Sequence, residues 1–274
     1  MVPAASAGFL TPESGGSPNA DDISSLYTLV LAVAIVVFVG VEGALIYSLI
    51  RYRRGKNPEA AQIRGNTRLE LGWTIGATVI LVVLAVMTFV KLPAIQDPPN
   101  SKANGFNATN GVMVADTDRR LPPDGKSLNI CVNGQQYIWR YTYADDCQKA
   151  TKDVATEVFS YQELVVPVAT TVTLDINAQD VAHSWWIPKL GGKFDAIPGV
   201  VNHTWFQIPE NQAGTLFTGQ CAELCGRNHA NMTAQVRALS VPDFEKWFAQ
   251  QKKDIAAANA AAIAQRKKFE GEAE

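Results

Sequence analysis

The sequence predicts a membrane-anchored protein in which a hairpin of two transmembrane helices is followed by an extracytoplasmic all-β domain. Two long apolar runs near the N-terminus predict the helices, and period-two alternation after residue 128 predicts the strands. The chain has 274 residues and a formal net charge of -2. These totals give no indication of a nucleic-acid partner.

The first apolar run covers residues 26–50 and the second covers residues 71–92. Each is long enough to cross a hydrocarbon core of about 30 Å as a helix. The alternative is two buried helices of a large soluble protein, but the rest of the chain cannot supply the apolar surroundings that both would need. We therefore predict a transmembrane hairpin over residues 26–93 in contact with membrane lipid. Glu42 should face protein, because a charge exposed to lipid is costly.

The loop between the two helices, residues 51–69, is basic, whereas residues 1–25 contain no Lys or Arg. Positive charge favours the cytoplasmic side, so we expect the N-terminal tail and everything after Pro93 to lie outside. The tail, residues 1–25, is rich in Gly, Ser, Pro and Ala and is expected to be poorly ordered. It shows no signal-peptide pattern, and a processed precursor remains an open alternative. The basic residues are Arg51, Arg53, Arg54, Lys56, Arg64 and Arg68.

The outer domain is predicted to cover residues 94–241. Its apolar residues alternate in the segments 171–177 and 234–238, as in half-buried strands. Gly and Pro separate several such segments, which is typical of a Greek-key sandwich or barrel. The remaining residues, 242–274, are rich in Ala, Lys and Gln and favour a largely solvated helix.

The segment with candidate metal ligands is CAELCGRNHANM, residues 221–232, which holds two thiols, an imidazole and a thioether. Sulfur ligands favour copper, and a Met beside Cys and His is typical of electron-transfer copper rather than structural zinc. A mononuclear blue site needs one Cys, whereas two thiolates can bridge two metal ions. Such a pair needs a further imidazole, which leaves His183 and His203 as candidates. A zinc site or a disulfide in this loop is the competing interpretation.

The loop closely resembles the CuA loop of cytochrome c oxidase subunit II. Residues 180–185, DVAHSW, and 195–199, DAIPG, resemble a second signature of that family, whose histidine is a copper ligand. The resemblance covers residues 20–248 and implies a cupredoxin fold for the outer domain. It implies two copper ions bridged by both cysteines, with a ligand set of His183, Cys221, the Glu223 carbonyl, Cys225, His229 and Met232. In this scheme His203 is a structural or surface residue.

The same resemblance implies the electron-accepting subunit of an oxidase that reduces dioxygen to water and translocates protons. The expected partners are oxidase subunit I with its haem, other oxidase subunits, and cytochrome c or a cytochrome c-bearing complex as donor. Electrons would arrive at Tyr137, which stands where the family usually has Trp, or at Trp139. The Glu223 carboxylate would reach a magnesium or manganese ion shared with subunit I. Acidic Asp145, Asp146 and Asp180 would steer a basic donor.

Glu70 resembles the family's acidic residue at the mouth of a proton pathway in subunit I. A carboxylate stabilised by the helix dipole at the start of the second helix explains its position equally well. Cys131 and Cys147 are expected to form a disulfide outside the membrane rather than remain free thiols. A CxxCH haem motif is absent from the sequence, so the donor should be a separate protein. This absence, and the lack of a mitochondrial presequence, favour a bacterial plasma membrane.

Three rival functions are compatible with parts of the pattern. A copper-dependent nitric oxide reductase subunit could carry the same loop, and only its partner would distinguish it. A quinol oxidase subunit would share the fold but lack the copper ligands that this chain retains. A copper carrier would need exchangeable, exposed ligands and would not need the helix features around Glu70.

Overall fold

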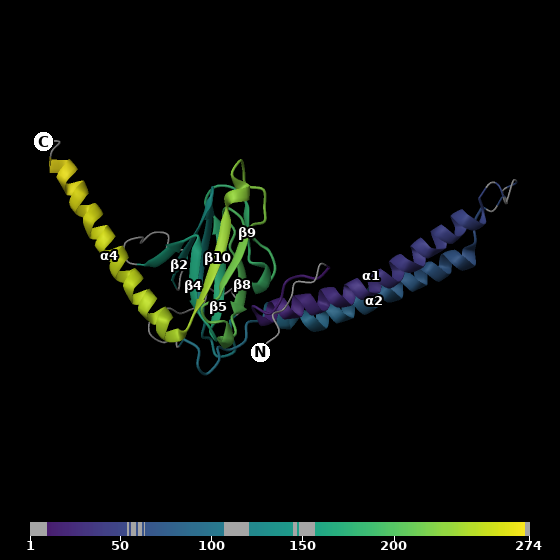
Figure 1. Cartoon of the computed structure of the whole chain (residues 1–274), viewed down its shortest axis with the longest axis horizontal. Coiled ribbons are helices and arrows are strands. Elements are labelled where there is room, and N and C mark those ends of the chain that lie inside the picture. Colours follow the sequence, from purple (N-terminus) through teal and green to yellow (C-terminus); the bar gives the residue numbers. More distant parts are fainter. Residues whose placement is uncertain are drawn as a thin grey trace. The chain divides into compact units, whose positions relative to one another are not determined.

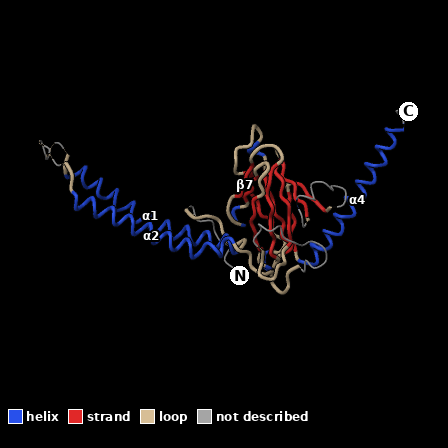
Figure 2. Tube along the Cα trace, turned by 180° about the vertical axis from the view of Figure 1, so that it is seen from behind, coloured by secondary structure: helices blue, strands red, loops and turns tan. Residues whose placement is uncertain are grey.

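The computed structural model describes residues 10–53, 55, 59, 62, 64–106, 121–144, 147 and 157–271. Figures 1 and 2 show two kinds of structure, a pair of long helices and a domain built on strands. Residues 24–93 form one compact unit, and the described residues on either side of that range form the other. Arg54, Lys56, Asp145 and Asp146 lie outside the described residues.

The helical unit consists mainly of α1 (Pro18–Arg51) and α2 (Thr67–Gln96), which lie side by side (Figures 1 and 2). Both are long and apolar enough to cross a membrane, and their most apolar windows bury no residue inside the protein. Large aliphatic and aromatic side chains such as Val36 and Phe89, each 73% exposed, are costly in water and suit lipid. Helix α2 continues through Pro93 and ends later than the apolar pattern predicts.

The outer unit is a sandwich of two five-stranded sheets, in the orders β3-β2-β1-β5-β8 and β4-β10-β9-β6-β7. Strand β1 pairs parallel with β5, and β10 pairs parallel with β4, while the other neighbouring strands in these two orders are antiparallel. The strands are β1 (Leu128–Gln135), β2 (Ile138–Tyr143), β3 (Val158–Tyr161), β4 (Glu163–Pro167), β5 (Thr171–Ala178), β6 (His183–Trp186), β7 (Phe194–Ala196), β8 (Asn202–Gln207), β9 (Leu216–Cys221) and β10 (Thr233–Leu239).

The core lies between the two sheets and follows the period of two expected for strands. Strand β10 alternates as predicted, with Ala234, Val236 and Ala238 fully buried. Strand β5 differs, because its polar face is buried too. There Thr173 exchanges hydrogen bonds with Ser127 and Asn129, so the polar groups are satisfied without water.

The end of the N-terminal tail is ordered against the outer domain, contrary to the expected disorder. Ser17 and Asn19 are buried, and the Asn19 side chain donates to the Trp205 carbonyl at 2.8 Å. The Gln207 backbone N–H donates to the Ser17 hydroxyl at 3.0 Å. Helix α1 therefore begins at Pro18, because polar contacts and a Pro suited to the first turn extend it beyond the apolar run.

Helix α4 (Val241–Gly271) follows β10 and corresponds to the predicted C-terminal helix. Its first turns pack on the sandwich through Phe244, which is 1% exposed, and through Trp247, whose ring centroid lies 5.5 Å from that of Tyr143. Further along, Ile263 and Phe269 are more than half exposed. Only the first part of this helix is therefore held by the domain's own core.

Cys131 and Cys147 form the predicted disulfide, with their Cα atoms 5.4 Å apart. Cys131 lies in β1, and Cys147 follows the end of β2 by four residues. The bond therefore joins β1 to the segment after β2 and closes a loop of 16 residues.

Replacing this pair by Cys131→Ala and Cys147→Ser should lower the free energy of unfolding by about 3 kcal/mol, the value expected for a loop of this length. The reason is that the open loop gains conformational freedom in the unfolded chain. Urea unfolding of the full chain in detergent, followed by tryptophan fluorescence, measures the effect. An unchanged midpoint would show that the disulfide does not stabilise the domain.

Candidate metal centre

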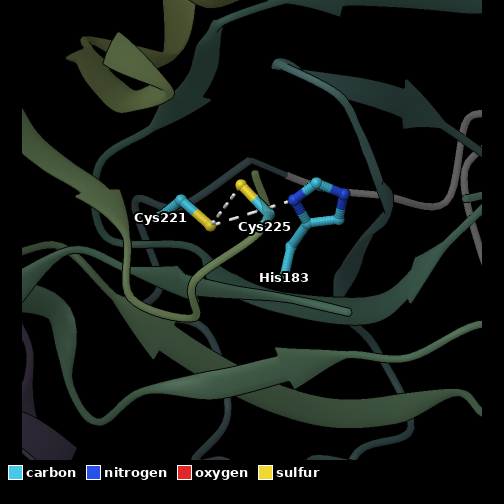
Figure 3. A group of neighbouring side chains, drawn as sticks. All are labelled: His183, Cys221 and Cys225. Atoms are coloured by element: carbon cyan, nitrogen blue, oxygen red, sulfur yellow. Dashed lines mark hydrogen bonds between the residues drawn. The ribbon is translucent and has the colours of Figure 1, made fainter. Parts of the chain in front are cut away.

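Strand β6 places His183 inside the sandwich with 0% exposure. It pairs with Ala196 of β7, and two residues later Trp185 pairs with Cys221 at the end of β9. Because β6 and β9 are neighbours in one sheet, the imidazole lies beside the start of the loop that carries the thiols. Figure 3 shows the ring with one nitrogen turned toward both sulfur atoms.

The loop that follows β9 is closed by backbone hydrogen bonds at both ends. The Cys221 N–H donates to the Met232 carbonyl, and the Ala222 N–H donates to the Ser184 carbonyl, both at 2.8 Å. A short 3-10 turn, η4 (His229–Asn231), sits between Cys225 and Met232. Cys221 and Met232, the first and last residues of the twelve-residue segment, are thereby brought back to one small volume.

The predicted ligand atoms meet there. The Cys221 and Cys225 sulfurs are 3.9 Å apart, and both cysteines are free thiols rather than a disulfide. His183 Nδ1 lies 3.9 Å from Cys221 Sγ, and His229 Nδ1 lies 3.5 Å from Cys225 Sγ. Met232 Sδ is 3.8 Å from Cys225 Sγ, and the Glu223 carbonyl oxygen is 3.3 Å from Cys221 Sγ. All six predicted groups are therefore brought together, and His183, Cys221 and Cys225 form a cluster that could hold a metal ion.

Two glycines permit the close packing around this cluster. A Cβ at Gly134 would lie 3.0 Å from the His183 ring, so a side chain there would press on the imidazole. Gly226 has φ of +131° and its missing Cβ would lie 2.7 Å from the Tyr137 hydroxyl. The β1–β2 turn can therefore lie directly on the loop backbone.

Asp180 and Gln136 connect the cluster to its surroundings. His183 Nε2 lies 2.9 Å from Asp180 Oδ1, and since a carboxylate only accepts, Nε2 carries the proton and Nδ1 presents its lone pair to the thiols. The other Asp180 oxygen accepts the Gln136 N–H at 2.6 Å. The Gln136 side chain in turn donates to the Cys225 carbonyl at 2.6 Å. These contacts fix the imidazole and the loop in one orientation.

Burial and hydrogen bonds shift the ionisation of two groups at the cluster in opposite directions. Burial, and after it the neighbouring Cys221 thiol, raise the pKa of the Cys225 thiol to about 11. Burial also raises the pKa of Asp180, but hydrogen bonds from His183 and from the Gln136 and Val181 N–H groups outweigh it and hold that pKa below its ordinary value. The thiolate form of Cys225 therefore requires a compensating positive charge, which a metal ion supplies.

The two aromatic residues predicted to receive electrons differ in exposure. Trp139 is 0% exposed, with its ring centroid 5.9 Å from that of His183, so it cannot touch a docking protein. Tyr137 is half-buried at the β1–β2 turn and contacts Gly226, the residue after Cys225. Of the two aromatic residues, only Tyr137 can therefore contact a docked electron donor.

The remaining predicted residues lie away from the cluster or have other contacts. In β8, His203 Nδ1 lies 2.8 Å from Oδ1 of Asp175, its partner in the neighbouring strand β5, which agrees with its exclusion from the ligand set. Glu70 accepts a hydrogen bond from the Asn66 N–H, while the Asn66 side chain accepts one from Leu69 N–H, both at 3.2 Å. Glu70 therefore belongs to the cap that begins α2.

The sequence does not predict the supporting role of two residues. It indicates Asp180 only as a charge that steers a donor, although a carboxylate three residues before His183 in a short connection is a usable signal for a histidine partner. Gln136 has no such signal, because an amide in a β-turn is common. Its contact with the Cys225 carbonyl joins residues 89 positions apart and follows only from the fold.

Two family models match this chain. The model described as "Cytochrome C oxidase subunit II, periplasmic domain" matches residues 128–239, and "Cytochrome C oxidase subunit II, transmembrane domain" matches residues 5–90. Together they confirm the predicted fold class of a helical hairpin followed by a cupredoxin-like β-domain.

Individual proteins agree with these matches. The chain is 30% identical to cytochrome c oxidase subunit 2 of Cereibacter sphaeroides over 87% of this chain and 81% of that one. It is 32% identical to cytochrome c oxidase subunit 2 of Alkalihalophilus pseudofirmus over 80% of this chain, but spans only 56% of that longer relative. The crystal structure of the periplasmic domain of subunit II of cytochrome oxidase of Bradyrhizobium japonicum is 30% identical, with a TM-score of 0.41, and the match covers 53% of this chain and 100% of that one. The chain therefore belongs to the cytochrome c oxidase subunit II family, whose members are subunits of haem-copper oxidases.

Proposed function

We propose that this chain is the electron-accepting subunit of a cytochrome c oxidase and holds a binuclear copper centre. The observation that carries the proposal is the meeting of two free thiols, two imidazole nitrogens, a thioether and a backbone carbonyl around one buried volume. When bound, the copper pair accepts and donates one electron at a time. The partner subunit carries the haem and the oxygen chemistry, and the complex translocates protons.

The donor set fits copper better than the rival metals. A zinc site has no use for the Met232 thioether, which lies among the other donors and is 1% exposed. Hard cations prefer carboxylate and carbonyl oxygens. Of the six groups here, the loop supplies three sulfur atoms and one imidazole, and β6 supplies a second imidazole. A carrier would need exposed ligands for exchange, but His183, Cys221, Cys225 and Met232 are all buried.

The residues of the chain have distinct tasks in this proposal. Cys221 and Cys225 would be ligands to both ions, His183 and Met232 would complete the ligand set of one ion, and His229 and the Glu223 carbonyl would complete that of the other. Asp180 holds the tautomer in which His183 Nδ1 is free to bind. A rigid, dry shell reduces the rearrangement that accompanies each change of charge, which favours rapid electron transfer.

Tyr137 is the proposed point at which electrons arrive from cytochrome c or a cytochrome c-bearing complex. Its contact with Gly226 gives a short route through the backbone to Cys225. The Glu223 side chain is exposed and is therefore available to a magnesium or manganese ion shared with subunit I. The complex is proposed to lie in a bacterial plasma membrane, with the β-domain outside.

A copper-dependent nitric oxide reductase is the second candidate, because its partner would differ while this chain could keep the same ligands. A quinol oxidase subunit fits less well, since the complete donor set would then have no use. Oxygen consumption by the purified complex distinguishes the first two functions.

In the assembled complex, Cys225→Ala should reduce oxygen consumption with reduced cytochrome c by about a hundredfold or more, since loss of supporting groups alone costs about 10–100-fold at metal sites. The partner's haem should still be reduced by dithionite. Ser184→Ala is the matched control, because this buried hydroxyl has no hydrogen-bond partner among the described residues. Activity in Cys225→Ala close to that of the control would contradict the proposed electron route.

The proposed role of Glu70 at the mouth of a proton pathway can be tested by substitution. Glu70→Gln keeps an oxygen that can accept the Asn66 N–H but removes the acid. If protons pass through this group, oxygen turnover and proton uptake should fall at least about tenfold. The two rates are measured together in vesicles that contain the complex. Unchanged rates would leave Glu70 with its capping role alone.

A further inference from the structure

The charges around Tyr137 indicate what kind of donor can dock there. Hydrogen bonds bring several segments together at this end of the sandwich. Besides the Gln136 contacts with Asp180 and Cys225, the Gln162 N–H donates to the Trp139 carbonyl at 2.8 Å. The Gln162 side chain also donates to the Thr233 hydroxyl at 2.9 Å. We call the exposed and half-buried residues of 135–140, 158–163, 179–182, 225–228 and 233–237 the Tyr137 surface.

This surface carries no excess of negative charge. Its charged side chains are two carboxylates, Asp180 and Glu163, and three guanidinium groups, Arg140, Arg227 and Arg237. The balance is therefore positive by one charge. A donor with a ring of lysines would gain no long-range attraction from these residues.

Both carboxylates are also engaged within the chain. Glu163 forms a two-pronged ion pair with Arg237, with distances of 2.7 and 2.8 Å. Asp180 accepts from His183 and Val181 through one oxygen and from Gln136 through the other. Binding a donor lysine would compete with contacts that hold the centre itself, so Asp180 is poorly suited to the steering role expected from the sequence.

Uncharged side chains supply the accessible area instead. Tyr161 is 50% exposed, Val181 is 39% exposed and Ile138 is 36% exposed. Gln136 and Gln179 are also exposed. Apolar and amide groups around a half-buried tyrosine are typical of the centre of a protein interface that forms by desolvation.

We propose that the donor docks on the Tyr137 surface through apolar and amide contacts, and that it is a c-type cytochrome whose haem edge is framed by uncharged side chains rather than lysines. This inference rests on the proposed function, because it specifies the partner of the same electron-accepting site. Association by desolvation depends weakly on salt, whereas association steered by charge slows steeply as salt screens it.

The test uses the assembled complex and stopped-flow measurement of the rate at which a reduced cytochrome c with an uncharged haem edge delivers electrons. Between about 10 mM and about 200 mM salt the second-order rate constant should change by less than about twofold. Ile138→Ser and Val181→Ser should each lower it by about threefold or more through lost apolar contact. Ile138→Glu should make a lysine-ringed cytochrome c react faster at low salt than it does with the unchanged chain.

Ile263→Ser is the matched control, because Ile263 is an exposed aliphatic residue of α4 and lies outside the Tyr137 surface. A fall of about tenfold or more with salt would overturn the inference, as would equal rates for Ile138→Ser, Val181→Ser and Ile263→Ser. Failure of the proposed function looks different. In that case the unchanged chain would show no copper signal that disappears on reduction with dithionite, whatever the donor.

Discussion

The hydrogen bonds that join β6, β9 and the end of the ligand loop determine where every proposed metal ligand lies. Pairing of Trp185 with Cys221 brings His183 to the first thiol, and the bond from Cys221 N–H to the Met232 carbonyl returns the thioether to the same place. The intervening residues must then form a compact loop, which turns His229 toward Cys225. A backbone framework in the sandwich thus fixes the positions from which the ligand side chains extend.

Burial of this cluster has a cost that the surrounding residues reduce. Burial disfavours the thiolate form of Cys225, so that thiol depends on a bound cation for its charged form. Asp180 and Gln136 satisfy groups at its edge, and the missing side chains of Gly134 and Gly226 leave room for this packing. The same packing keeps Trp139 inside and leaves Tyr137 at the surface, which separates a structural aromatic residue from one that a partner can reach.

Much of the fold and the loop chemistry follows from local sequence patterns. The loop ligands could be predicted because they lie within a dozen residues, and the alternation in β10 could be predicted because one of its faces is buried. The choice of His183 over His203 needed the family resemblance, since nothing local shows which histidine reaches the loop. The buried polar face of β5 and the ordered turn at Ser17 arise from contacts with distant segments, so local patterns do not contain them. The burial of Trp139 is equally a property of the assembled sandwich.

Binding of two copper ions that share an electron can be measured on the full chain in detergent, reconstituted with copper. The copper-to-protein ratio and the electron paramagnetic resonance spectrum are recorded. About two coppers per chain and a seven-line hyperfine pattern are expected, because two thiolates can bridge both ions. One copper per chain with a four-line pattern, or no bound copper, would contradict the ligand assignment and the electron-accepting role that depends on it.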